Sequence, residues 1–190
     1  MLKKFFAFLA ALCLVIGCLL IYKNFFNITN PFFDTDVLEK NKYYGTIMQN
    51  DEIIEGDFAI KIERVSGYNN GYIYKLELNK TDKTQQGNTD DFLLGYFYVC
   101  ENKIVKMNDD LQEIATVCQE ESIKDNLSEE ELGWHSSLQY SGEECSYTSY
   151  NNRVETGFYE SMIWNKQEGL KYYRRGFGAG ADSVEISLQN

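Results

Sequence analysis

The chain has very little of what metal and catalytic centres are usually built from. It contains a single histidine, His135, and no pair of cysteine or histidine residues has the spacing of zinc ligands. The acidic pairs at residues 90–91 and 109–110 lack the alternating oxygen ligands and the central glycine of a calcium-binding loop, so we interpret them as solvated turns. The sequence therefore predicts no bound metal and no cofactor.

Basic residues are also scarce. Three of the 18 basic residues lie at positions 3, 4 and 23, and no acidic residue precedes Asp34, so residues 24–190 carry 15 basic and 29 acidic groups, a net charge of −14. Such a surface is repelled by phosphate backbones and by anionic lipid headgroups. The charge argues against nucleic-acid binding and against a body that lies flat on a membrane, and it fits solubility or a cationic partner.

Charge is absent altogether from residues 5–22, an apolar run that follows Lys3 and Lys4. A helix of this length extends about 27 Å, against a hydrocarbon core of about 30 Å. We therefore expect residues 1–23 to form a transmembrane anchor that stays on the protein. The two preceding lysines orient the N-terminus toward the cytoplasm, which makes this a single-pass protein of the cell membrane with an extracytoplasmic C-terminal domain.

Processing at Cys18 is the alternative to a permanent anchor. Residues Val15-Ile16-Gly17-Cys18 resemble the lipobox of bacterial lipoproteins, a resemblance which implies that Cys18 is lipidated and becomes the new N-terminus. The apolar residues 19–22 favour the anchor, because a mature lipoprotein usually continues with a polar tether and only the full run approaches bilayer length. Both interpretations place the body outside the membrane. Abundant Asn, Lys, Tyr and Ile with one proline suggest a bacterial chain from an A·T-rich genome.

The pattern beyond residue 42 is that of a β-rich domain. Period-two alternation and turn residues predict strands at residues 58–63, 72–78, 92–100, 104–107, 146–150, 156–164, 170–174 and 183–188. Helical spacing after Asp110 predicts a short helix over residues 111–118, and Ser128 with Glu131 forms the capping box of a second. We expect residues 24–42 to be a stalk and residues 43–190 to be one α+β, β-rich domain, an antiparallel sheet or small barrel with one or two short helices.

Three cysteines lie beyond the apolar run, at positions 100, 118 and 145. Outside the cytoplasm an odd number of cysteines allows at most one intramolecular disulfide. The sequence leaves open a Cys118–Cys145 bond, a Cys100–Cys118 bond, or three buried thiols.

A glycine-rich loop near the C-terminus is a candidate anion site. Residues 176–181 have the form of a relaxed dinucleotide-binding fingerprint, but only nine residues follow and they alternate like a strand, so the context rejects that motif. Behind Arg174 and Arg175, backbone N–H groups around Gly176, Gly178 and Gly180 would suit a carboxylate or phosphate. A tight structural turn explains the same glycines.

His135 is the weak candidate for catalysis. Its neighbours Trp134, Ser136 and Ser137, with Cys145 further on, offer the residue types of a nucleophilic site, although a lone histidine beside a tryptophan is typical of a structural role. The sequence therefore favours a membrane-tethered extracytoplasmic binding or interaction protein of the cell envelope, with an unidentified protein or small-molecule partner, over an enzyme. A cell-surface hydrolase using His135 is the alternative, and an immunity or inhibitor protein also fits the acidic tethered body. A hydrolase requires His135 in a cleft with a hydrogen-bonded partner.

Overall fold

The computed structural model describes residues 29–49, 51–81, 91–120, 125–129, 134–151, 157–176, 178 and 182–189. The apolar run at residues 5–22, Cys18 within it and most of the polar segment after residue 81 lie outside this range. Within the range, no helix is long and apolar enough to cross a membrane. The anchor and lipobox interpretations therefore stay predictions.

The described residues form one antiparallel sheet of twelve strands and one helix. The helix is α2 (Thr35–Lys40), and the strands are β1 (Lys42–Gln49), β2 (Glu52–Tyr68), β3 (Gly71–Lys80), β4 (Phe92–Cys100), β5 (Lys103–Met107), β6 (Glu113–Gln119), β7 (Asp125–Glu129), β8 (Trp134–Ser141), β9 (Glu144–Asn151), β10 (Phe158–Asn165), β11 (Gly169–Gly176) and β12 (Ser183–Leu188). In the sheet they follow the order β6-β5-β4-β3-β2-β1-β12-β11-β10-β9-β8-β7. The expected antiparallel, β-rich architecture is confirmed.

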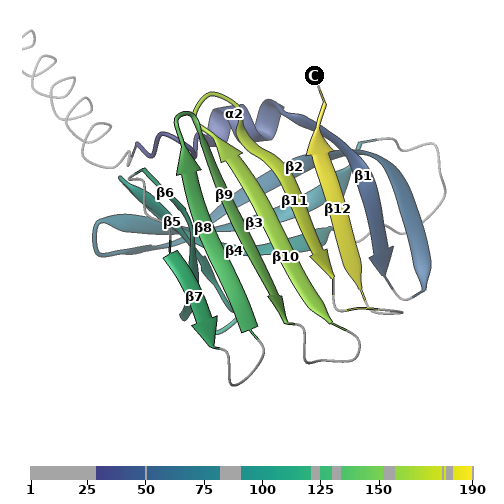
Figure 1. The fold of residues 1–190 in the computed structure, drawn as a ribbon. Helices are drawn as coiled ribbons and strands as arrows, with labels where there is room; N and C mark the ends of the chain where they lie inside the picture. Colours follow the sequence, from purple (N-terminus) through teal and green to yellow (C-terminus); the bar gives the residue numbers. More distant parts are fainter. Residues whose placement is uncertain are drawn as a thin grey trace, which may run out of the picture.

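Two meanders make up the sheet. Consecutive strands pair from β1 through β6 and again from β7 through β12, and the β1–β12 pair joins the two series. Figure 1 shows the second meander in green to yellow across the front and the first in blue to teal behind it. The sheet curls until β6 contacts β8 and β9, so the body is nearly barrel-like.

The junction between the meanders depends on a glycine. Gly45 of β1 pairs with Ile186 of β12 on one side and with Gly56 of β2 on the other. A Cβ atom at position 45 would overlap the carbonyl oxygen of Glu185 and would lie 2.8 Å from Ile186 Cα. Only glycine therefore allows β1 and β12 to approach this closely.

Aromatic side chains fill the space between the two meanders. Trp164 of β10 is fully buried, with its ring centroid 6.0 Å from that of Phe97 on β4 and 6.0 Å from that of Phe33. Burial of each such side chain contributes roughly 1.5–3 kcal/mol relative to exposure. The core thus explains part of the abundance of aromatic residues.

The packed body begins before the predicted boundary at residue 43. Phe32, Phe33 and Leu38 belong to the core, so the last part of the expected stalk at residues 24–42 is folded. Asp34 caps α2, because its Oδ1 accepts from the N–H groups of Asp36 at 2.8 Å and Val37 at 3.3 Å. The sequence shows the cap, but six helical residues are too few for a recognisable period.

The helix expected at residues 111–118 is wrong, because residues 113–119 form β6. Leu111 has a positive φ of 57° and sits in a turn closed by its N–H bond to Asn108 O. Register shifts between β5 and β6 break the period of two, so that the consecutive residues Val117 and Cys118 are both buried. A bulged strand therefore produced a spacing that resembles a helix.

The second expected helix, with Ser128 and Glu131 as its capping box, lies largely outside the described residues and stays a prediction beyond Glu129. Residues 125–129 form β7, which pairs with β8, and residues 130–133 lie outside the described range. All eight predicted strands coincide with or overlap observed ones, whereas β1, β6, β7 and β8 were not predicted. The only described helix is α2, within the segment that was expected to be a stalk.

Candidate functional site

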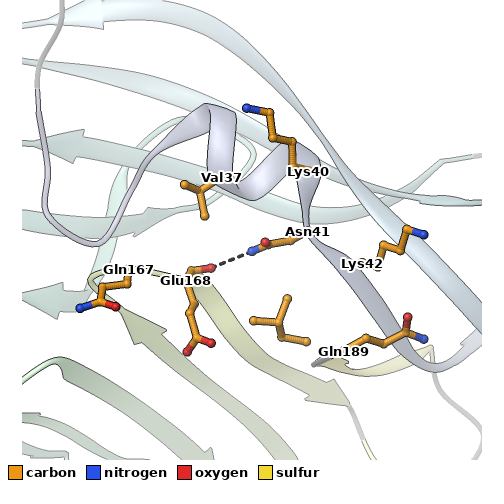
Figure 2. Close-up of a pocket in the computed structure, with 8 residues that line it drawn as sticks. Val37, Lys40, Asn41, Lys42, Gln167, Glu168 and Gln189 are labelled. Atoms are coloured by element: carbon orange, nitrogen blue, oxygen red, sulfur yellow. Dashed lines mark hydrogen bonds between the residues drawn. The ribbon is translucent and has the colours of Figure 1, made fainter.

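A pocket of about 570 Å³ opens beside the C-terminal end of α2 (Figure 2). Its lining comes from α2, from the turn between β10 and β11, and from the end of β12. The lining residues are Val37, Lys40, Asn41, Lys42, Gln167, Glu168, Leu188 and Gln189. Segments from both ends of the folded body therefore meet at this one place.

Asn41 holds the two sides of the pocket together. Its Nδ2 donates to the carbonyl oxygen of Glu168 at 2.7 Å, the bond drawn in Figure 2. The turn that carries Glu168 is itself fixed by Asn165, whose Oδ1 accepts from Gln167 N at 2.9 Å and Glu168 N at 3.2 Å. Beneath it, the Tyr43 hydroxyl donates to Leu170 O at 2.9 Å. These hydrogen bonds connect the end of α2 to the β10–β11 turn and to the start of β11.

The far side of the pocket is fixed by Gln189. Its backbone N–H donates to Lys42 O at 2.9 Å, and its side-chain Nε2 donates to Asp57 Oδ1 at 2.6 Å. A second hollow of about 310 Å³ adjoins this point and shares Leu188 and Gln189 with the pocket. We call the two hollows together the seam groove, because the second is lined by residues of β1 and β12 at their junction.

The pocket offers hydrogen-bonding groups of both signs of charge. In Figure 2, Lys40 and Lys42 extend away from Asn41 in different directions. The lining contains amides, two lysines and a glutamate, and no serine, cysteine or histidine. Such a set of groups can bind a polar ligand through hydrogen bonds and ion pairs.

A second polar cluster lies inside the body. Lys106 of β5 donates to Glu160 Oε1 of β10, and Tyr173 Oη of β11 lies 2.9 Å from the same oxygen. The residues are 8%, 4% and 0% exposed respectively. Burial lowers the pKa of the Lys106 ammonium, an effect that the Glu160 charge opposes, and burial raises the pKa of Tyr173 well above its usual range.

A β-bulge completes this buried charge cluster. Leu76 pairs with Gly95 and Glu77 with Leu93, so Leu94 is left without a partner in the ladder. Its carbonyl oxygen lies 3.0 Å from Tyr173 Oη and accepts from Arg175 Nη1 at 3.3 Å. The bulge therefore turns a free carbonyl toward the second meander.

Sequence reasoning missed both the pocket and the buried charge cluster. The pocket lies largely on residues that were assigned to the stalk. The cluster had a signal, because Lys106 shares its face with Ile104 and Glu160 shares its face with Met162 and Trp164 under a period of two. A charged residue at an inward-facing position of a strand is the sequence signal for a buried ion pair.

His135 lies on β8, away from the pocket. Its ring stacks on Tyr150 of β9, with centroids 4.9 Å apart and an interplanar angle of 18°. The two residues are directly opposite in the ladder. Among the described residues no carboxylate is hydrogen-bonded to His135, and the hydrolase hypothesis gains no support from its surroundings.

The two arginines of the glycine-loop prediction are engaged on opposite faces of β11. Arg174 lies over the ring of Tyr159 at 4.4 Å and 3.5 Å from Glu185, whereas Arg175 reaches inward to Leu93 O and Leu94 O. Gly176 lies under the Tyr159 ring, and Gly178 has a φ of 98°. Gly180 lies outside the described residues, so the anion loop stays a prediction, without two converging arginines.

The three cysteines separate into one single residue and one close pair. Cys100 is half-buried near the β4–β5 turn, with its Sγ 3.6 Å from Asn102 Oδ1. Cys118 and Cys145 are completely buried as free thiols, and the N–H of Gln119 donates to Cys145 Sγ at 3.4 Å. No group of three or more His, Cys, Asp or Glu residues within the described range is placed to hold a metal ion.

Comparison of the chain with models of protein families, with curated proteins and with solved structures finds no match.

Proposed function

We propose that the protein is a membrane-tethered binding or interaction module whose folded body lies outside the cytoplasm, in a bacterial cell envelope. The uncharged run at residues 5–22 behind Lys3 and Lys4 supports the tether and its orientation. The net charge of −14 beyond residue 23 supports a body that stands away from anionic headgroups. Asn30 is packed in the described body, and the seven residues from Lys23 to Asn30 span at most about 25 Å even when fully extended, which keeps the body close to the membrane.

The pocket beside α2 is the observation that carries the binding role. Its lining presents amide and charged groups on a framework fixed by Asn41 and Gln189, and it holds no serine, cysteine or histidine. Elsewhere in the described body, the interior between the meanders is filled by aromatic and aliphatic side chains and by the buried Lys106–Glu160 pair. The ligand of the proposed site is therefore a small polar molecule or a polar segment of another protein, bound from outside at the seam groove.

The tether and the topology are tested by treating intact cells or spheroplasts with an added protease. We expect the body to be degraded from outside and the protein to remain with membranes after carbonate extraction. A body that is protected in intact spheroplasts and released by carbonate would contradict the proposal. Intact mass after membrane extraction separates the two tethers, since a lipoprotein loses residues 1–17 and gains a lipid on Cys18.

The binding role is tested by photo-crosslinking in cells. A photoreactive phenylalanine replaces Gln189 in the pocket or, as a control, Ile114, which is 59% exposed on β6. Intact mass detects an adduct of any size, so both a small molecule and a protein are visible. We expect adducts from position 189 that disappear when Val37→Trp fills the pocket, and none from position 114. Equal adducts at both positions, or none at 189, would refute a binding site there.

A further inference from the structure

Cys118 and Cys145 come from strands that are far apart in the sheet. In the strand order, β6 is one edge and β9 belongs to the other meander, yet the curl of the sheet brings Cα atoms of the two strands within 8 Å. The Gln119 N–H bond to Cys145 Sγ, at 3.4 Å, fixes the two strands at this point. Disulfides join residues whose Cα atoms are usually about 4.4–6.8 Å apart, which this approach permits.

The two cysteines are enclosed together. Both residues are 0% exposed, and the residue that follows Cys118 donates its backbone N–H to the Cys145 sulfur. Burial and the Cys145 sulfur raise the pKa of Cys118, whereas the hydrogen bond from Cys118 lowers the pKa of Cys145. Thiol oxidation proceeds through the thiolate. We therefore expect Cys118 to react most readily during folding, before the packing of β6 against β9 buries it.

Cys100 does not compete for Cys118. It lies on β4, separated from β6 by β5, and Cys100 pairs with Lys103 while Lys103 pairs with Gln119. Two strand spacings amount to about 9.6 Å, which exceeds the reach of a disulfide. Of the pairings that the sequence left open, the Cys100–Cys118 bond is therefore excluded by the sheet.

We propose that Cys118 and Cys145 form a disulfide that joins the edge strand β6 to β9 and holds the curled sheet closed. This proposal rests on the proposed extracytoplasmic location, where disulfide-bonded oxidants are supplied. One cysteine thiolate attacks the S–S bond of an oxidant disulfide, giving a mixed disulfide and one released thiol. The second cysteine then displaces the remaining oxidant thiol. The cysteine pair loses two electrons, the oxidant gains them, and both thiol protons end on its two sulfurs.

The pairing itself is tested on the purified full chain in detergent. The reduced protein is unfolded, refolded with oxidised glutathione, alkylated and digested without reduction. We expect one linked peptide pair containing Cys118 and Cys145, two hydrogens lighter than the reduced peptides, and an alkylated Cys100. A bond that involves Cys100, or alkylation of all three cysteines, would overturn the proposal.

Three variants distinguish a structural bond from an incidental one. Reductant should lower the melting temperature of the wild type and of Cys100→Ser by the same amount, and should leave Cys118→Ser and Cys145→Ser unchanged. Equal sensitivity of all four proteins would contradict the assignment. Alkylation of freshly lysed cells tests the location separately: a pair that links in detergent but is reduced in cells contradicts the extracytoplasmic body and leaves the pairing intact.

Discussion

The Lys106–Glu160 pair allows a direct test of how the two meanders are held together. The ion pair joins β5 to β10 across the interior, and only 10% and 6% of the two side chains are exposed. Removing one partner leaves the other charge buried without its counter-charge. Glu160→Gln and Lys106→Met should therefore each destabilise the protein by about 3–5 kcal/mol.

The double variant Lys106→Met/Glu160→Leu should cost less than either single change, within about 1 kcal/mol of the wild type, because no unpaired charge remains. Tyr173 still has an acceptor in that variant, since its hydroxyl lies 3.0 Å from Leu94 O. Lys171→Met is the matched control. It removes a 2.8 Å pair with Glu144 whose side chains are 35% and 46% exposed, and it should cost no more than about 1 kcal/mol.

Urea unfolding of the full chain in detergent, followed by tryptophan fluorescence, measures these free energies. Trp164 is completely buried and should report on the loss of the core. Two results would refute the reasoning: single variants that cost no more than the surface control, or a double variant whose cost is the sum of the singles. Either would mean that the pair is solvated or that each partner acts alone.

Three further predictions concern ionisation, packing and capping. Burial raises the pKa of Tyr43 and Tyr173 above the usual 10.0. The free energy of unfolding is therefore unaffected by these two groups below pH 10 and falls above it by up to about 1.4 kcal/mol per pH unit for each tyrosine. The tyrosinate absorbance of these two residues should appear only with unfolding, and ionisation of all tyrosines in the folded protein would contradict this. Gly45→Ala should destabilise by about 1–3 kcal/mol because its Cβ meets Glu185 O, whereas Gly67→Ala, whose Cβ would have an ordinary 3.5 Å contact, should stay within about 0.5 kcal/mol in the same urea titration. Asp34→Ala should cost about 1 kcal/mol through loss of the α2 cap, and an unchanged unfolding midpoint would show that α2 is held by Leu38 alone.

The strands that the sequence revealed are those whose alternation is regular. β12 was predicted over residues 183–188 because Val184 and Ile186 point inward and their neighbours point outward. β6 was misread because bulges against β5 place two adjacent residues, Val117 and Cys118, inside. Bulges are set by partner strands that are distant in the sequence, so a local period cannot reveal them.

The candidate site was harder to predict than the fold. The pocket combines residues 37–42 with residues 167–168 and 188–189, and nothing local in the sequence joins these segments. They meet because β12 pairs with β1, a pairing between the two ends of the folded body. By contrast, the number of cysteines beyond the apolar run was enough to predict that at most one disulfide can form. The choice of partners depends on the curl of the sheet, which the sequence does not show.

The side-chain contacts that hold the two meanders together lie on different strands from the proposed binding site. Lys106–Glu160, Arg175–Leu93 and Gln119–Cys145 each join a strand of the first meander to a strand of the second. The edge strands β6 and β7 stand at opposite ends of the strand order, so no strand pairing joins these two ends of the sheet. These three contacts therefore keep the curled sheet closed. The seam groove lies at the β1–β12 junction, where the ladder is continuous. Substitutions at Lys106, Glu160, Cys118 or Cys145 should therefore loosen β6 and expose an unpaired strand edge, whereas Val37→Trp should block the pocket and leave closure intact.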